Sequence, residues 1–176
     1  MSDSGKPPVE KTYQSKEQYL SLQADSLRDP ESFWAGIAGQ LLWHKKWDKV
    51  LKWDSPFAQW FVGGLLNASE NAVDRHVKSW RKNKAAYLWE GENGERRTIT
   101  YGELYREVNR LASVLQNLGL GKGDTVAIYM PLVPEFPITM LACARLGLPF
   151  TVVFSGFSAK ALAERIQDCG EDRRDR

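Results

Sequence analysis

Residues 125–168 read TVAIYMPLVPEFPITMLACARLGLPFTVVFSGFSAKALAERIQD, and this stretch decides the fold. Two short apolar runs, 125–130 and 150–154, alternate with two segments of helical character, 135–146 and 159–168. The order strand, helix, strand, helix predicts parallel strands that are joined by a right-handed crossover. We therefore predict an α/β fold with a partial parallel sheet and flanking helices.

The segment upstream of this stretch predicts a hairpin followed by a long helix. Asn93-Gly94 is a strong turn signal between the two expected strands of the hairpin, 85–89 and 97–100. Thr100 and Glu103 have the spacing of a capping box, which marks the start of a helix. An apolar stripe then follows at helical spacing: Leu104, Val108, Leu111, Leu115 and Leu118.

The N-terminal part is rich in tryptophan and is predicted to be mainly helical. All seven tryptophans lie between Trp34 and Trp89. Ser15 and Asp29 are N-cap residues, so we expect helices over 16–28 and from Pro30 onward, and a further helix over 69–80. Large aromatic rings bury well, so a place in a core or between layers is the first interpretation of the tryptophans. A platform that stacks on a sugar or a base is the alternative.

The composition indicates a globular protein of a reducing compartment. The chain has 176 residues, 43% of them hydrophobic, and its 24 Lys and Arg are interleaved with 22 Asp and Glu. This balance leaves no basic face for nucleic acid. Cys143 and Cys169 form no paired motif, which argues against a zinc site and favours the cytoplasm. Prolines and charges interrupt the most apolar stretch, 126–154, so we expect no membrane span.

One segment stands where open parallel sheets bind their ligands. Ser155-Gly156-Phe157-Ser158 follows the predicted strand 150–154 at its carboxyl end. Gly156 would let a ligand approach the backbone closely, and Ser158 both caps the next helix and offers a hydroxyl. A purely structural turn is the alternative, and these four residues taken alone favour that alternative.

The remaining candidate motifs predict structure rather than chemistry. Gly121-Lys122-Gly123-Asp124 contains a Gly-Lys pair, but it leads from a helix into a strand, and Gly123 stands where a phosphate loop needs Ser or Thr. We therefore predict a turn. His44 and His76 have no second ligand at metal-binding spacing and no nucleophile elbow near them. We predict no catalytic and no metal-binding residue in this chain.

Taken in order, the motifs of the chain resemble the AMP-forming acetyl-coenzyme A synthetases of the adenylate-forming superfamily. In the N-terminal part they are Phe61-x-Gly63-Gly64-x-Leu66-Asn67, Asn71-x-x-Asp74-Arg75-His76 and Trp89-Glu90-Gly91. Further on they are Thr100-Tyr101-x-Glu103-Leu104, Lys122-Gly123-Asp124-x-Val126-x-Ile128-Tyr129-Met130-Pro131 with Pro134-Glu135, the run from Met140 to Gly147, and Val152-Val153-Phe154-x-Gly156-Phe157-Ser158. The resemblance runs from about Tyr19 to Cys169.

The resemblance implies an enzyme that activates acetate with ATP and Mg²⁺ to acetyl-adenylate and pyrophosphate, and then transfers the acetyl group to the thiol of coenzyme A (CoA). Its partners would be these small molecules. In the family, the phosphate loop, the nucleotide pocket and the catalytic lysine lie downstream of position 176. We therefore expect no tight binding of ATP, CoA or Mg²⁺ by this chain alone, and self-association through exposed sheet edges.

The resemblance also implies one ligand-binding segment. Phe154-Ser155-Gly156 matches the segment at the CoA entrance of relatives, which often carry glycine where Ser155 stands. Phe154, Ser155 and Gly156 are therefore the predicted cofactor-binding residues. The arginines that usually hold the nucleotide part of CoA follow further downstream, so the chain alone should bind CoA weakly.

Four regions follow from the resemblance. We expect a flexible arm over 1–14, an acetyl-CoA-synthetase-type N-terminal region over 15–82, and the truncated start of the AMP-binding α/β domain over 83–170. The charged residues 171–176 depart from the family, because six charges in a row cannot form a buried strand. These residues lead to the hypothesis that the chain is a truncated or frame-shifted gene product.

The predicted function is that of an N-terminal fragment of an AMP-forming acetate–CoA ligase, inactive by itself. Two alternatives stay open. The chain could be a non-catalytic binding or regulatory module that docks on a full-length synthetase, or a fragment of a ligase for propionate or another short acid.

Overall fold

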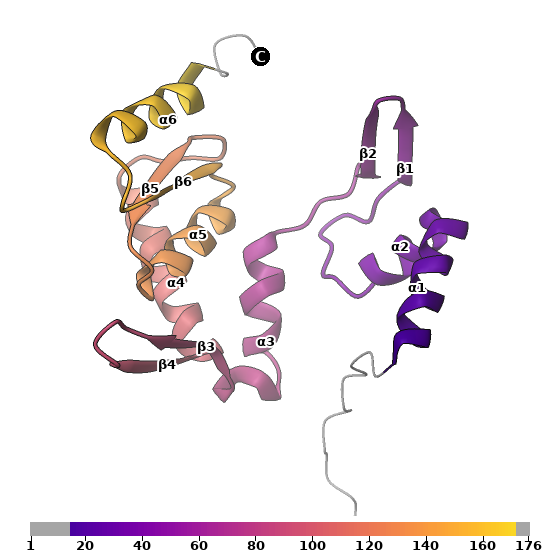
Figure 1. The fold of residues 1–176 in the computed structure, drawn as a ribbon, viewed down its shortest axis with the longest axis horizontal. Coiled ribbons are helices and arrows are strands. Elements are labelled where there is room, and N and C mark those ends of the chain that lie inside the picture. The colour runs from indigo at the N-terminus through magenta and orange to yellow at the C-terminus, as the bar shows by residue number, and fades with distance from the viewer. Residues whose placement is uncertain (1–14, 172–176) are drawn as a thin grey trace, which may run out of the picture. The chain divides into compact units, whose positions relative to one another are not determined.

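The computed structural model describes residues 15–171, which form two compact units (Figure 1). Unit 1 comprises the described residues up to Leu41 together with Lys46–Gly64. Unit 2 comprises Leu42–Lys45 and the described residues from Leu65 onward. The predicted arm over 1–14 and residues 172–176 of the predicted charged tail lie outside the described residues.

Unit 1 contains two helices and one hairpin. The helices are α1 (Lys16–Arg28) and α2 (Pro30–Ala38), and the antiparallel strands are β1 (Lys49–Asp54) and β2 (Phe57–Val62). Ser15 Oγ accepts from the Gln18 N–H at 3.2 Å, and the Asp29 carboxylate accepts from the Ser32 N–H at 3.0 Å. Both helices therefore begin at the caps that the sequence predicts.

The hairpin β1–β2 is the element of unit 1 that sequence reasoning missed. Its strands are largely exposed on both faces, so they lack the alternation of apolar and polar residues that marks a strand with one buried face. Its turn is Ser55-Pro56, without the Asn-Gly or Asp-Gly signal of a two-residue hairpin turn. The N-terminal region is therefore helical at its start and continues into an antiparallel hairpin.

The tryptophans lie closer to the surface than the core interpretation requires. Trp34 and Trp60 pack edge to face with ring centroids 6.4 Å apart, and the Trp47 and Phe61 rings are 5.1 Å apart. Trp53 is 66% exposed. All seven tryptophans lie within the described residues, and none of them is buried. They do not fill the core of either unit.

Unit 2 begins with short helical turns where one helix over 69–80 is predicted. The segment folds as a π-helical turn (Glu70–Asp74), α3 (Arg75–Val77) and a 3₁₀ turn (Trp80–Asn83). The remaining elements are β3 (Ala85–Glu90), β4 (Arg96–Thr100), α4 (Tyr101–Asn117), β5 (Val126–Met130), α5 (Glu135–Leu146), β6 (Phe150–Phe154) and α6 (Ala159–Glu171). β3 pairs antiparallel with β4, and β5 pairs parallel with β6, as predicted.

Helix α4 begins at the predicted capping box. The Glu103 N–H donates to Thr100 Oγ1 at 3.2 Å, and the Glu103 carboxylate accepts from the Thr100 N–H at 2.8 Å. Two hydrogen bonds from Thr100 hold the pKa of the Glu103 carboxyl below its usual range. The bond from the Thr100 backbone N–H contributes most, and the bond from its hydroxyl comes second. Glu103 therefore stays ionised at the positive end of the helix dipole.

The core of unit 2 lies between α4 and α5, which pack against each other (Figure 1). Its buried residues are Val73, Ile99, Leu104, Val108, Ala112, Ile138 and Ala142. Gly147 ends α5 with φ +70°, and the Leu148 N–H donates to the Cys143 carbonyl at 2.9 Å, as in a Schellman motif. The chain reverses direction at this helix end and enters β6 three residues later. Among the helices of the described part, none combines the length and the apolar character that crossing a membrane requires.

Candidate ligand site at the carboxyl ends of the parallel strands

Strands β5 and β6 end side by side. Met130 and Phe154 are register partners and are the last residues of their strands. The loops 131–134 and 155–158 therefore leave the sheet at one edge, which is the edge where open parallel sheets bind ligands. The predicted residues Phe154, Ser155 and Gly156 lie together at this edge.

The segment after β6 is a tight turn. The Phe157 N–H donates to the Phe154 carbonyl at 3.0 Å, which makes Ser155 and Gly156 the two central residues of the turn. Among the described residues, the Gly156 N–H has no acceptor. The rings of Phe154 and Phe157 are 53% and 47% exposed. The turn thus offers a backbone donor and, at its first and last residues, two exposed apolar rings. We call residues 154–157 the β6 turn.

Gly156 is not required by packing inside the chain. A Cβ added at this position would meet the Phe154 ring at 3.5 Å, which is ordinary van der Waals contact. Its φ lies outside the positive range that favours glycine. A methyl group therefore fits beside Gly156, so packing within the chain does not explain why this position is glycine.

Two side chains from elsewhere in unit 2 hold the β6 turn. The Tyr129 hydroxyl, on β5, lies 2.8 Å from the Ser155 carbonyl oxygen and 3.1 Å from that of Phe157. The Arg165 guanidinium, on α6, lies 5.5 Å from the centre of the Phe157 ring. The turn is therefore restrained from the neighbouring strand and from the helix that follows it.

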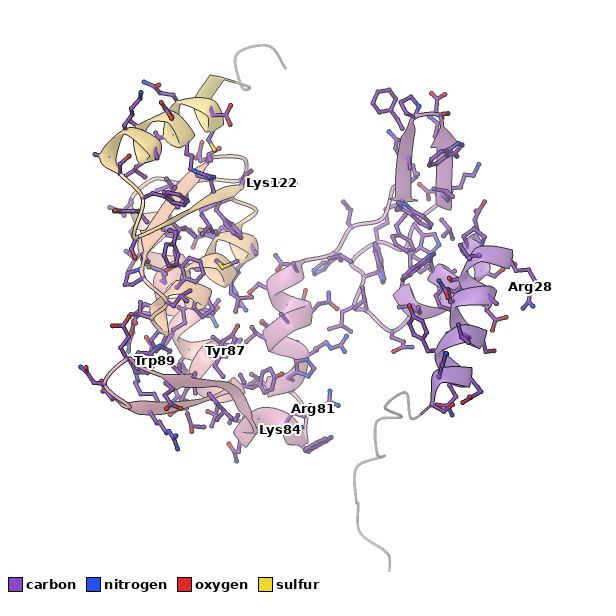
Figure 2. The ribbon with its side chains drawn as sticks, in the orientation of Figure 1. Arg28, Arg81, Lys84, Tyr87, Trp89 and Lys122 are labelled. Carbon is purple, nitrogen blue, oxygen red and sulfur yellow. The ribbon has the colours of Figure 1, made fainter. Side chains whose placement is uncertain are left out.

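A third tether holds the loop after β5. Trp89, on β3, donates its indole N–H to the Leu132 carbonyl at 2.8 Å (Figure 2). A Cβ at Gly91 would lie 2.9 Å from Cη2 of this indole, closer than real Cβ contacts allow. The glycine at position 91 therefore leaves room for the Trp89 indole, and the hydrogen bond from this indole fixes the backbone of loop 131–134.

A part-buried polar network connects the start of unit 2 to α4 and α5. Arg145 on α5 donates to both carboxylate oxygens of Asp74, and its Nη1 also donates to Asn109 Oδ1 on α4 at 2.8 Å. The Arg145 and Asp74 side chains are 18% and 15% exposed. The Asn67 side-chain amide donates to the Arg145 carbonyl at 2.9 Å. We call Asn67, Asp74, Asn109 and Arg145 the Arg145 network.

The segment 42–45 is tied to the same region. The Asn71 side chain accepts from the Leu42 N–H at 2.8 Å and donates to the Leu42 carbonyl at 3.0 Å. His44 Nε2 lies 2.7 Å from Glu70 Oε2. The side chains of Glu70 and Asn71 therefore act as structural tethers of this segment.

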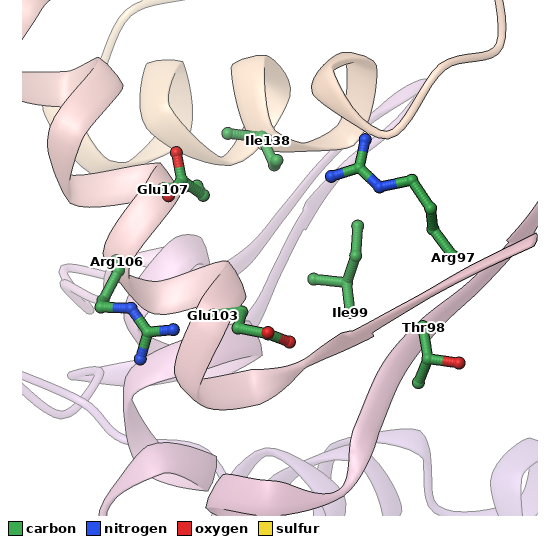
Figure 3. A pocket seen from close by; sticks show the side chains of 7 residues that line it. All are labelled: Arg97, Thr98, Ile99, Glu103, Arg106, Glu107 and Ile138. Carbon is green, nitrogen blue, oxygen red and sulfur yellow. The ribbon is translucent and has the colours of Figure 1, made fainter.

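Helices α4 and α5, together with β4, line a separate pocket of about 350 Å³ (Figure 3). Its charged lining consists of two arginines, Arg97 and Arg106, and two glutamates, Glu103 and Glu107. Arg97 also lies 3.5 Å from the Glu135 carboxylate on α5. The opposite charges offset one another, so the pocket has no excess of positive charge with which to attract a phosphate group.

The described residues carry no metal centre, because no group of three or more His, Cys, Asp and Glu side chains within 15–171 could hold an ion. Cys143 is fully buried, and desolvation raises the pKa of its thiol, which keeps it protonated. Gly121-Lys122-Gly123-Asp124 forms a turn, in which the Asp124 N–H donates to the Gly121 carbonyl at 3.0 Å. Lys122 lies against Gly147 (Figure 2).

Sequence reasoning identified the β6 turn but missed three long-range contacts: the one that holds this turn, the one that holds the loop after β5, and the Arg145 network. Tyr129, Trp89 and Arg145 stand 26, 43 and 71 positions away from their partners. The hydrophobic periodicity of a sequence predicts helices and strands, but it does not predict which residues so far apart in the chain come into contact. The available signal was chemical: a tyrosine hydroxyl, an indole N–H and a guanidinium inside otherwise apolar elements need polar partners.

Two family models match adjacent parts of the chain. The model for AMP-binding enzymes matches residues 73–172, and the model for the acetyl-coenzyme A synthetase N-terminus matches residues 19–72. Together they cover both described units.

Curated relatives and a solved structure match most of the chain. The acetyl-coenzyme A synthetase of Chlorobaculum tepidum is 53% identical over 154 residues, which are 88% of this chain and 23% of that protein. That of Pyrobaculum aerophilum is 57% identical, over 85% of this chain and 24% of that protein. The structure of acetoacetyl-CoA synthetase from Streptomyces lividans superposes with a TM-score of 0.79 at 30% identity, over 86% of this chain and 24% of that one. The chain thus spans about a quarter of the length of these proteins.

Proposed function

Since the chain belongs to the AMP-binding enzyme family, we propose that it serves as the N-terminal part of an AMP-forming acetate–CoA ligase. The overall reaction would convert acetate, ATP and CoA to acetyl-CoA, AMP and pyrophosphate through an acetyl-adenylate. The relatives named as acetyl-coenzyme A synthetases favour acetate over propionate or another short acid.

The role proposed for this chain is to form one wall of the CoA entrance with Phe154, Ser155 and Gly156. The observation that supports this proposal is the chemistry of the β6 turn. The arm of CoA that leads to its thiol is a chain of methylene groups with two amides, so it needs hydrogen-bond partners between apolar contacts. The Gly156 N–H, which has no acceptor among the described residues, lies in a turn whose first and last residues carry exposed phenylalanine rings, and this combination matches that chemistry.

The described residues offer no comparable match to the chemistry of ATP or Mg²⁺. A triphosphate needs a cradle of backbone N–H groups and cations, and Mg²⁺ needs oxygen ligands beside it. Within 15–171, the Gly-Lys segment is a turn between a helix and a strand, and no acidic cluster could hold an ion. We therefore assign no step of acetate activation to the residues of this chain.

Gly156→Ala tests the proposed CoA entrance. The chain has space for the added methyl group, so the variant should fold normally, whereas a ligand that approaches the Gly156 backbone would collide with it. The test protein is a chimera in which residues 19–172 replace the matching quarter of the Chlorobaculum tepidum enzyme. We expect the KM for CoA to rise about tenfold, equivalent to about 1.4 kcal/mol, while acetate-dependent ATP–pyrophosphate exchange is unchanged.

Gly36→Ala is the matched control, because a Cβ at Gly36 meets nothing within 4 Å and the residue lies on α2, in unit 1. It should leave the KM for CoA unchanged. An unchanged KM for CoA in the folded Gly156→Ala chimera would remove the β6 turn from the CoA entrance.

We also propose that the chain by itself self-associates through its parallel sheet. In the described structure this sheet has only the strands β5 and β6, and Val152 and Phe154 are exposed on it. Unpaired strand edges with apolar side chains recruit further strands. Sedimentation velocity should show species larger than the 20.0 kDa monomer, in amounts that grow with concentration. A single monomeric species at all concentrations would contradict this. We place the protein in the cytoplasm, where two free cysteines stay reduced.

A further inference from the structure

We propose that Tyr129 is a positioning residue for CoA, because its hydroxyl holds the central peptide of the β6 turn in the orientation that presents the Gly156 N–H to the ligand. The proposal rests on the proposed CoA entrance. It adds a residue outside the turn, on the neighbouring strand, to the groups that determine how CoA binds.

The geometry of the peptide unit links the two groups. The Ser155 carbonyl and the Gly156 N–H belong to one trans peptide plane, so they point in opposite directions. The Tyr129 hydroxyl lies 2.8 Å from the Ser155 carbonyl oxygen. When that carbonyl points toward Tyr129, the Gly156 N–H must point away from Tyr129. The phenol therefore fixes the direction of a donor that it does not touch.

The sequence of the turn makes this restraint necessary. A four-residue turn with glycine in its third position favours the type II form, which requires a positive φ at that glycine. Gly156 stands in the third position, yet it does not have a positive φ. The type I and type II forms differ mainly by a rotation of the central peptide, here the peptide between Ser155 and Gly156. The hydrogen bond from Tyr129 opposes that rotation.

Other contacts hold the ends of the turn and leave its centre free to rotate. The Phe157 N–H to Phe154 carbonyl bond is common to both turn forms, and Arg165 contacts the Phe157 ring. Among the described residues, the Tyr129 hydroxyl is the only donor to the Ser155 carbonyl. The Tyr129 hydroxyl also lies 3.1 Å from the Phe157 carbonyl oxygen, so its loss removes one contact at the end of the turn as well. The Phe157 N–H to Phe154 carbonyl bond remains, so loss of the hydroxyl should free the central peptide without unfolding the turn.

Tyr129→Phe removes the hydroxyl and keeps the ring, and it is tested at two levels. In the full 176-residue chain, the Gly156 amide should show exchange between two turn forms in NMR relaxation-dispersion spectra, while amides of α4 are unaffected. In the chimera, the KM for CoA should rise about threefold to tenfold, the range expected for one lost hydrogen bond, while the KM for ATP and the rate of ATP–pyrophosphate exchange are unchanged.

Tyr87→Phe is the matched control. It makes the same substitution on β3 of the same unit, at a hydroxyl that has no hydrogen bond among the described residues. Both of its readouts should equal those of the unchanged protein. A purely structural role for Tyr129 would instead lower the stability and affect the kinetics with ATP and with CoA alike.

The two readouts separate the failure of this proposal from the failure of the proposed function. A Tyr129→Phe chain whose Gly156 amide shows no new exchange overturns the positioning role, whatever the enzyme does. New exchange at Gly156 with an unchanged KM for CoA also overturns it, because the turn would then move without consequence for CoA. If the unchanged chimera makes acetyl-adenylate but cannot use CoA, the proposed CoA entrance fails, and the positioning role for CoA fails with it.

Discussion

Replacing Arg145 by methionine is expected to lower the free energy of unfolding by about 2–3 kcal/mol, less than for a fully buried ion pair because the Arg145–Asp74 pair is part-buried. The Asp74 carboxylate would keep its place, 15% exposed, after losing the guanidinium that donates to both of its oxygens. A buried charge without its partner costs far more than the net contribution of the intact pair. Asn109 Oδ1 would lose a donor at the same time. Urea unfolding of the full chain, followed by circular dichroism, measures the change.

Arg110→Met is the control for this prediction. Arg110 pairs with Glu107 at 3.3 Å on α4, but its side chain is 76% exposed. Water screens such a pair, so its loss should change the free energy of unfolding by at most about 1 kcal/mol. Adding Asp74→Asn to Arg145→Met should recover part of the stability, because no unpaired charge remains. Equal effects of the two methionine substitutions would contradict the role of the Arg145 network.

Local signals predicted the helices α4, α5 and α6 and the strands of unit 2, most of them to within one to three residues, but not the short helical turns over 70–83. Thr100 and Glu103 predicted the start of α4, because a capping box is recognised from four consecutive residues. Helix α5 and strand β6 were predicted with the bounds that they have, since Gly147 separates a helical pattern from an apolar run. The hairpin β1–β2 was missed because its exposed strands carry no alternation and its turn carries no glycine.

The candidate site was predictable only in part, for a physical reason. The position of Gly156 after a parallel strand follows from topology, and topology follows from the order of the elements. The contacts that shape the turn are different. Tyr129 sits in an apolar run that indicates a strand, and nothing near it in the sequence reveals that its hydroxyl reaches Ser155. Long-range polar contacts are fixed by how strands and helices pack, so they appear only in the folded chain.

The 176-residue chain by itself is expected to give no acetate-dependent ATP–pyrophosphate exchange above background. Stabilising the charge that develops on a transferring phosphate needs positioned donors and cations, and such positioned groups account for much of the rate enhancement of enzymes. Within 15–171, no segment forms a phosphate cradle and no cluster of acidic side chains could hold a metal ion. The expected effect is the complete absence of the reaction rather than a reduced rate.

The chimera with the Chlorobaculum tepidum enzyme provides the positive control, since the relative supplies the remaining three quarters of the length. If the chimera catalyses ATP–pyrophosphate exchange under conditions in which the chain alone shows none, the assay is shown to detect the reaction. The same preparation then serves for the CoA step.

The most direct measurement is acetyl-CoA formation from acetate, ATP and CoA, assayed side by side for the chain and for the chimera. We expect no product with the chain and steady formation of acetyl-CoA by the chimera, with a KM for CoA that rises in Gly156→Ala and is unchanged in Gly36→Ala. Formation of acetyl-CoA by the pure 176-residue chain would contradict this expectation, as would a folded chimera that catalyses ATP–pyrophosphate exchange but never transfers the acetyl group to CoA.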